Sequence, residues 1–311
     1  MRPKVHPPEL VFESTSRRTS QLQIGIVIAA ALVLGSVFVM KLAGQNFPPM
    51  GTQYLFSWSQ FDSPPAPPSS RTLVATGRDL YLLNCAVCHG DAGKGDGWRA
   101  RFLYPKPRDF TRGIYRFKTT ESGNLPTNRD LFRTISVGLQ NTAMPAWGYY
   151  LTEGDRWALV AYIKTFSRYF REDPAGTPIV LGQEPEISVE RVDRGQALYA
   201  KVGCADCHGP QGYGNGFAAK DMEDSFGVPI APRNFHVVSE FKRGRTLRDI
   251  ALTINTGNDG TPMPSFHNAL TRDQAWDLAS FVMSLPVEAP TFRGHGCPMM
   301  TTRAPMPMPG N

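Results

Sequence analysis

Cysteine is scarce in this chain, at 5 of 311 residues, and sequence patterns typical of β-strands are scarce as well. The shortage of strands argues against a thioredoxin-like redox site, because the C-x-x-C of such a site lies near a βαβ unit. Segments with G-x-G spacing are present between Gly93 and Gly97, but no strand pattern precedes them. A nucleotide site requires such a loop between a strand and a helix, which argues against that class of site too.

Four of the five cysteines lie in two copies of one pentapeptide with the pattern C-x-x-C-H. This pattern is the attachment signature of a c-type haem. Its two thiols have the spacing needed for thioether bonds to the two vinyl groups of one porphyrin, and the histidine then provides an axial imidazole to the iron. A C-x-x-C pair also serves as half of a zinc site, but a zinc site does not require the histidine that follows. The two copies consist of Cys85, Cys88 and His89, and of Cys204, Cys207 and His208.

The two motifs belong to an internal repeat. Cys85 and Cys204 are 119 residues apart, and the same separation relates Met144 to Met263, each of which is followed by proline. A repeat of this length indicates two copies of one domain, each with its own haem.

Each of these methionines lies 55 residues after the histidine of its own motif. A haem iron that only passes electrons needs a second axial ligand, and a thioether favours ferrous iron and so raises the reduction potential. Methionine also fills apolar cores, but the equal spacing in both copies favours Met144 and Met263 as iron ligands. His267 is a competing ligand in the second copy, although the first copy has no counterpart.

A Pro-Arg-x-Phe segment follows each glycine-rich loop and contains Arg108 in the first copy and Arg233 in the second. These arginines are 125 residues apart, so the second copy has six extra residues before this segment. A guanidinium group binds carboxylates through charge-assisted hydrogen bonds. Arg108 and Arg233 are therefore candidates to bind haem propionates, and the alternative is that both are solvated surface arginines.

The haem motif near the start of each copy, the Met-Pro pair near its end and the flanking helical patterns together resemble the class I cytochrome c family. The whole chain resembles membrane-anchored dihaem cytochrome c subunits of bc-type or related respiratory complexes. The resemblance implies an all-α fold and two covalently attached haem c groups. In that family a small residue and an aromatic residue allow the first helix to cross the last one closely. Gly77 with Tyr81, and Gly195 with Tyr199, have this spacing.

The N-terminal segment indicates the compartment. From Thr19 to Met40 the chain carries no charge, and about 20 apolar residues are enough to cross a bilayer as a helix. Four basic residues precede this stretch and only Lys41 follows closely, which places the N-terminus in the cytoplasm. A cleaved signal peptide is the alternative. We expect a single-pass protein of the cell inner membrane, with its haem domains on the periplasmic side.

The expected fold is all-α, with one N-terminal transmembrane helix followed by two tandem cytochrome c domains. Helices are expected over residues 128–137, after Thr152, and after Thr271 with Gln274 in a capping box. The expected boundaries are 1–18 for the cytoplasmic N-terminus, 19–43 for the transmembrane anchor, 44–70 for a Pro/aromatic linker, 71–170 for the first cytochrome c domain, 171–188 for a second linker, 189–286 for the second cytochrome c domain, and 287–311 for a Pro/Met-rich tail.

Two segments outside the repeats leave alternatives open. The first linker contains Tyr54, Phe56, Trp58 and Phe61, which are expected to dock on a haem domain, lie at the membrane interface or bind a partner subunit. Cys297 lies in the tail and is not expected to bind haem. It is free to pair with another subunit, to join a soft copper site, or to have no redox role.

The net charge of +6 is unevenly distributed. Residues 71–170 contain 15 Lys or Arg against 8 Asp or Glu, whereas residues 190–285 contain 10 against 11. An exported haem domain does not meet nucleic acid, so the positive charge indicates either a solvated face or a docking surface for an acidic redox partner protein. The cations expected to steer such a partner are Arg99, Arg101, Lys106, Arg112, Arg116 and Lys118.

Three classes of function remain. The sequence favours a membrane-anchored dihaem cytochrome c that relays single electrons to an exported acceptor, as a subunit of a respiratory or photosynthetic membrane complex rather than as an enzyme on its own. The alternative is a dihaem c-type oxidoreductase of the peroxidase or thiosulfate dehydrogenase class, which would need an open axial position. A sensory module is disfavoured because no output domain is recognisable.

Overall fold

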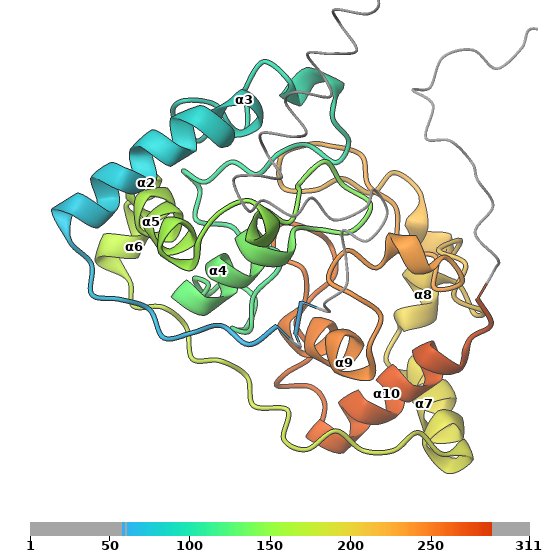
Figure 1. Cartoon of the computed structure of the whole chain (residues 1–311). Helices are drawn as coiled ribbons and strands as arrows, with labels where there is room; N and C mark the ends of the chain where they lie inside the picture. Colours follow the sequence, from blue (N-terminus) through green and yellow to red (C-terminus); the bar gives the residue numbers. More distant parts are fainter. Residues whose placement is uncertain (1–57, 60, 288–311) are drawn as a thin grey trace, which may run out of the picture. The chain divides into compact units, whose positions relative to one another are not determined.

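The structure is a computed structural model that describes residues 58–59 and 61–287 of the chain (Figure 1). The regular structure of these residues is helical, apart from two isolated β-bridges. The expected anchor, Tyr54, Phe56 and Cys297 lie outside the described residues. Within the described part, no helix has the length and apolar character needed to cross a membrane.

Four α-helices repeat in the same order in the two copies, α2, α3, α4 and α5 in the first and α7, α8, α9 and α10 in the second, while the shorter elements differ (Figure 1). The first copy contains α2 (Arg71–Asn84), α3 (Ala86–His89), η1 (Ala100–Phe102), α4 (Asn128–Val137), η2 (Trp147–Tyr149), α5 (Glu153–Ile163), η3 (Lys164–Phe166) and α6 (Tyr169–Glu172). The second copy contains α7 (Val189–Lys201), α8 (Cys204–His208), η4 (Phe217–Ala219), η5 (Val238–Glu240), α9 (Leu247–Thr256) and α10 (Arg272–Ser284).

Side-chain capping fixes where the last helix of each copy begins. Thr152 is the N-cap of α5 and exchanges hydrogen bonds with Asp155 in a capping box. Thr271 and Gln274 form the equivalent box at the start of α10. Such a box satisfies backbone N–H groups that lack a partner within the helix. The predicted starts of these helices are confirmed, as is the helix over residues 128–137.

The first and last helices of each copy cross at a glycine. A Cβ atom added at Gly77 would overlap the carbonyl oxygen of Ala158 on α5, and one added at Gly195 would overlap that of Asp277 on α10. The buried aromatic residues Tyr81 and Tyr199 lie one turn further along α2 and α7. The close crossing implied by the family resemblance is therefore present in both copies.

Replacing Gly77 with alanine is expected to destabilise the fold by about 1–3 kcal/mol, since the added methyl group forces α2 away from α5. Gly154→Ala is the matched control, because the nearest atom to a Cβ at that position is 3.9 Å away. Its helix propensity should make it neutral or stabilising by up to ~1 kcal/mol. Denaturant unfolding of the holoprotein measures both changes, and equal effects of the two variants would contradict the close crossing.

Two residues of the first linker dock on the haem domains. Trp58 is 1 % exposed, and its indole Nε1 donates a hydrogen bond to Thr134 Oγ1 of α4 at 2.9 Å. Its backbone N–H donates to the Arg243 carbonyl in the second copy at 3.1 Å. Phe61 packs against the cores of both copies. For Trp58 and Phe61, docking on the haem domains is thus the alternative that the structure supports.

Candidate haem-binding sites

Each haem motif forms a short helix directly after the first helix of its copy. Cys85 is both the C-cap of α2 and the N-cap of α3, while Cys204 is the first residue of α8. The buried Tyr81 hydroxyl donates to the Gly90 carbonyl at 2.8 Å, which fixes the end of α3 against α2. None of the four motif cysteines forms a disulfide, so their thiols are free to bond to a haem. Burial raises the pKa of Cys85 to about 12 and that of Cys204 to about 11.

The motif histidines are oriented identically in the two copies. Nδ1 of His89 lies 3.1 Å from the Arg108 carbonyl oxygen, and Nδ1 of His208 lies 3.1 Å from that of Arg233. Each ring also stacks on a phenylalanine at 4.5 Å between centroids. A carbonyl only accepts a hydrogen bond, so Nδ1 carries the proton and Nε2 keeps its lone pair.

The histidines are also held in the neutral state that a metal ligand requires. Burial lowers the pKa of His89 to about 4 and lowers the pKa of His208 in the same way. Together, the free thiols, the fixed tautomer and the neutral ring fit a covalently bound haem with an axial imidazole.

Threonine side chains hold both Met-Pro loops in one conformation. Thr142 Oγ1 donates to the Leu139 carbonyl at 2.8 Å and accepts from the Met144 N–H at 3.1 Å. Thr261 makes the same two hydrogen bonds in the second copy, at 2.7 Å and 3.3 Å. Sequence reasoning missed these threonines, although T-x-M-P occurs in both copies. The matched loops fit a pair of methionine ligands, whereas His267 is exposed and belongs to the second copy alone.

The two methionine sites differ in one contact. Asn258 Nδ2 lies 3.5 Å from Met263 Sδ. Leu139 occupies the matching place in the first copy, where its N–H donates to the Met144 carbonyl as the Asn258 N–H does to that of Met263. The second sulfur therefore has an amide donor beside it, whereas the matching residue of the first copy has no amide group.

The two predicted propionate-binding arginines are not freely solvated. Burial lowers the pKa of Arg108 to about 10, and its guanidinium lies 5.5 Å from the ring centroid of Phe226. Arg233 is 34 % exposed and lies 3.7 Å from Glu240. Since each arginine also supplies the carbonyl that orients a motif histidine, its backbone lies at the candidate haem site of its own copy.

The prediction that six cations steer a partner is wrong for two of them, Lys118 and Arg116. Lys118 is fully buried and pairs with Asp259 at 2.5 Å, and Arg116 pairs with Asp224 at 2.6 Å. Both carboxylates belong to the second copy, so these charges join the copies to each other. Sequence counting could not separate such ion pairs from solvated charge, because the partners are more than 100 residues apart.

An exposed aromatic platform lies beside the first haem motif, and sequence reasoning missed it. Trp98 is 60 % exposed and Phe102 is 70 % exposed, with the guanidinium groups of Arg99 and Arg101 over their rings. The Arg99 N–H donates to the Val87 carbonyl, inside the motif, at 3.0 Å. In the second copy, Phe217 is exposed at the matching place, but alanine replaces Arg99 and lysine replaces Arg101.

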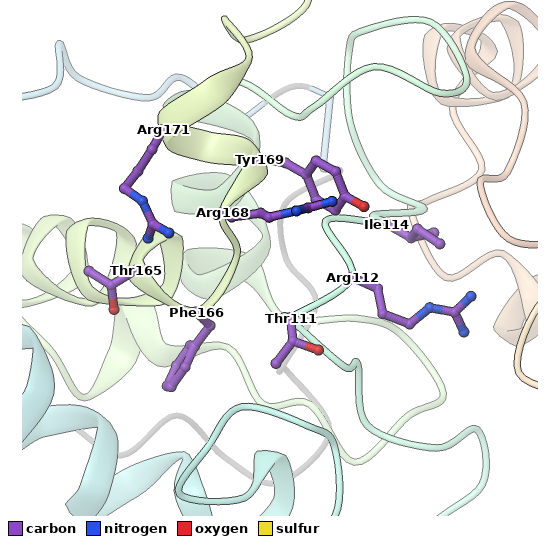
Figure 2. A pocket seen from close by; sticks show the side chains of 8 residues that line it. All are labelled: Thr111, Arg112, Ile114, Thr165, Phe166, Arg168, Tyr169 and Arg171. Carbon is purple, nitrogen blue, oxygen red and sulfur yellow. The ribbon is translucent and has the colours of Figure 1, made fainter.

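An open cavity of about 510 Å³ lies in the first copy, and its lining includes neither cysteine of the haem motif. Figure 2 shows the side chains that line it, which come from the Thr111–Ile114 loop and from the segment around α6. Three are arginines, namely Arg112, Arg168 and Arg171. Arg168 pairs with Glu172 at 3.7 Å and Arg112 donates to the Ser225 carbonyl, so much of this charge is already engaged.

Comparison with known proteins identifies the family. The family model described as cytochrome C oxidase, cbb3-type, subunit III matches residues 72–163 and 190–282. A chain of the Kuenenia stuttgartiensis reducing HAO-like protein complex Kustc0457/Kustc0458 is 40% identical, with a TM-score of 0.66. That match covers 71% of this chain and 98% of the other. Cytochrome c domains carry covalently bound haem c and transfer electrons, and two tandem domains fit two haems. The chain belongs to the cytochrome c family described as cbb3-type subunit III.

Proposed function

We propose that the protein is a dihaem cytochrome c that relays single electrons, with His89 and Met144 as axial ligands of one haem and His208 and Met263 of the other. The observation that carries this proposal is the matched pair of sites. Both histidines have the same fixed tautomer, and both Met-Pro loops have the same threonine hydrogen bonds. A bound haem supplies a one-electron couple at each site.

Residues of the chain fix the positions of the proposed axial ligands, which favours rapid electron transfer. The Arg108 and Arg233 carbonyls hold each histidine ring in one tautomer, which would leave Nε2 to bind the iron of a haem with little reorganisation on a change of charge. Thr142 and Thr261 fix the backbone of the Met-Pro loops, and Met144 and Met263 would hold the second axial position of each haem from these loops. A reaction with a substrate at the iron needs an open axial position, which matched methionine ligands do not leave. This argues for an electron-transfer subunit rather than a dihaem enzyme.

We further propose that the protein works at the cell inner membrane, with residues 19–43 as a retained anchor and the haem domains on the periplasmic side. The uncharged apolar stretch and the basic residues before it support this. The 40% identical chain from a reducing HAO-like protein complex supports partner subunits in a redox assembly. A quinol-oxidising or other respiratory or photosynthetic complex remains the proposed setting. Protease digestion of the haem domains in intact spheroplasts tests the orientation.

Electrons are proposed to enter or leave through the platform of Trp98, Arg99, Arg101 and Phe102. Its aromatic surface and positive rim suit an acidic redox partner. Reversing both arginines to glutamate should slow oxidation of the reduced protein by anionic hexacyanoferrate(III) several-fold at low salt, and should accelerate oxidation by a cationic cobalt(III) phenanthroline complex. Added salt should reduce both effects, since it screens exposed charges over about 10 Å at 0.1 M.

Lys220→Glu is the matched control for the single reversal Arg101→Glu, because it reverses one charge at the corresponding place in the second domain. Stopped-flow spectroscopy measures the rates. An equal change in the Lys220 variant, or rates that do not depend on salt, would remove the platform as an electrostatic docking surface.

A further inference from the structure

Four basic side chains gather where the two cytochrome domains meet. The guanidinium of Arg108 lies 5.5 Å from the ring centroid of Phe226, which belongs to the longer loop of the second domain. Arg116 reaches the same loop and pairs with Asp224 at 2.6 Å. The four are Arg108 and Arg116 from the first domain and Arg233 and Lys242 from the second. Arg112 also lies over the Phe226 ring, at 4.4 Å, but its guanidinium donates to the Ser225 carbonyl.

Arg116 is the common neighbour of the other three. Burial is the main cause that lowers the pKa of Arg108, Arg233 and Lys242, and the charge of Arg116 lowers each of these pKa values further. The result is about 10 for Arg108 and about 8 for Lys242. The Lys242 carbonyl also accepts a hydrogen bond from the Gln140 N–H at 3.2 Å. Lys242 therefore lies against the loop that carries Met144.

The carboxylates around this cluster do not balance its charge. Asp224 is engaged by Arg116, and Glu240 lies 3.7 Å from Arg233. Asp109 also faces the cluster, but one of its oxygens accepts two hydrogen bonds from the residue two positions later. Four cations thus share three carboxylates, and each of the three also accepts hydrogen bonds from nearby N–H or hydroxyl groups.

Two buried donor groups at the cluster lack an acceptor among the described residues. They are the Tyr115 hydroxyl and Nε of Arg116. Tyr115 is 7 % exposed and lies close enough to Arg108 for that charge to lower its pKa, although burial raises the pKa more. Buried donors and buried positive charges are both costly without partners. The cluster is therefore built to receive anions.

A haem bound at each motif histidine would supply propionate carboxylates as anions for this cluster. The Arg108 and Arg233 carbonyls accept the hydrogen bonds from His89 and His208, so the cluster begins beside both axial imidazoles. Guanidinium groups bind carboxylates in a bidentate manner. A haem held at each histidine carries such carboxylates with it.

We propose that Arg108, Arg116, Arg233 and Lys242 form one anion site shared by the propionates of both haems, through which each domain helps to set the potential of the haem in the other. The proposal rests on the proposed dihaem function. A positive charge disfavours the more positive ferric state, so removing Arg116 or Lys242 lowers both reduction potentials.

A spectroelectrochemical titration of the full-length holoprotein tests this. In Arg116→Gln and in Lys242→Gln, both steps of the two-haem titration should move to lower potential. The expected change is about tenfold in each reduction equilibrium constant, which is 59 mV for a one-electron couple. Arg116→Lys keeps the positive charge, so both potentials should stay close to those of the unmodified protein. Arg78→Gln removes an exposed arginine of the first domain. It should change neither reduction equilibrium constant by more than about threefold.

A shift confined to one step in both variants would overturn the sharing of the site, as would an equal shift in Arg78→Gln. If Arg116→Gln does not fold, Lys242→Gln alone decides, because its side chain forms no ion pair within the described residues. The spectrum of the unmodified protein separates this proposal from the proposed function. A high-spin haem in that spectrum contradicts the His/Met ligation but leaves the charge effects on both potentials measurable.

Discussion

Replacing Asp259 with alanine is expected to destabilise the protein by about 3–5 kcal/mol, because it leaves the charge of Lys118 buried without a counter-ion. Lys118 is fully buried and Asp259 is 7 % exposed, and their charged atoms lie 2.5 Å apart. Asp259 also accepts hydrogen bonds from the Ser122 hydroxyl and the Gly123 N–H. All three donors belong to the first domain, so the substitution removes a tie between the domains as well as a counter-charge.

Denaturant unfolding of the holoprotein measures this loss. The double variant Lys118→Met with Asp259→Leu should regain most of the stability, since two apolar side chains of similar volume leave no charge buried alone. Asp273→Ala is the control, because that carboxylate is 83% exposed and lies 3.8 Å from Arg191. It should change stability by less than ~1 kcal/mol. If Asp259→Ala is as mild as this control, the pair does not hold the domains together.

Sequence reasoning worked where the physical cause is local. A capping box involves residues three apart, so Thr152 with Asp155 and Thr271 with Gln274 could be found from the sequence alone. The haem motif is equally local, because its thiols and imidazole lie on one short helix. The repeat also allowed an inference over a longer distance in the sequence. Met144 and Met263 could be predicted as ligands because each lies equally far from the histidine of its own motif.

Sequence reasoning failed where the cause lies between the repeats. Nothing in the sequence shows that Lys118 meets Asp259 or that Arg116 meets Asp224, since each pair joins elements more than 100 residues apart. The longer loop of the second copy was visible as six extra residues, but not its position against Arg108. The repeat allows equivalent residues of the two copies to be compared. It carries no information on which non-equivalent residues of the two copies contact each other.

The differences between the copies concern function more than fold. The core helices, histidine supports and methionine loops are alike, whereas the exposed arginines beside the first motif are missing from the second. Asn258 beside Met263 adds a donor that the first copy lacks. Hydrogen bonds near an axial ligand and nearby charges both tune a haem potential. Two copies of one scaffold can therefore hold their haems at different potentials, as a directional relay requires.

Replacing either axial methionine with alanine is expected to produce the largest functional change. Met144→Ala and Met263→Ala should each make one haem high-spin and lower its reduction equilibrium constant by at least roughly a hundredfold, because a soft ligand that favours ferrous iron is lost. The other haem should stay low-spin. Electronic absorption and electron paramagnetic resonance measure the spin states, and a redox titration measures the potentials.

Met283→Ala is the control for these variants, since that methionine packs against the core of the second domain and is not part of a Met-Pro pair. It should lower stability and leave both haems low-spin. The haem motifs are untouched in all three variants, so haem content should remain at two per chain, as the pyridine haemochrome assay reports. A fully low-spin spectrum with an unchanged potential in either Met-Pro variant would show that a different side chain binds that iron, and would return His267 to consideration in the second domain.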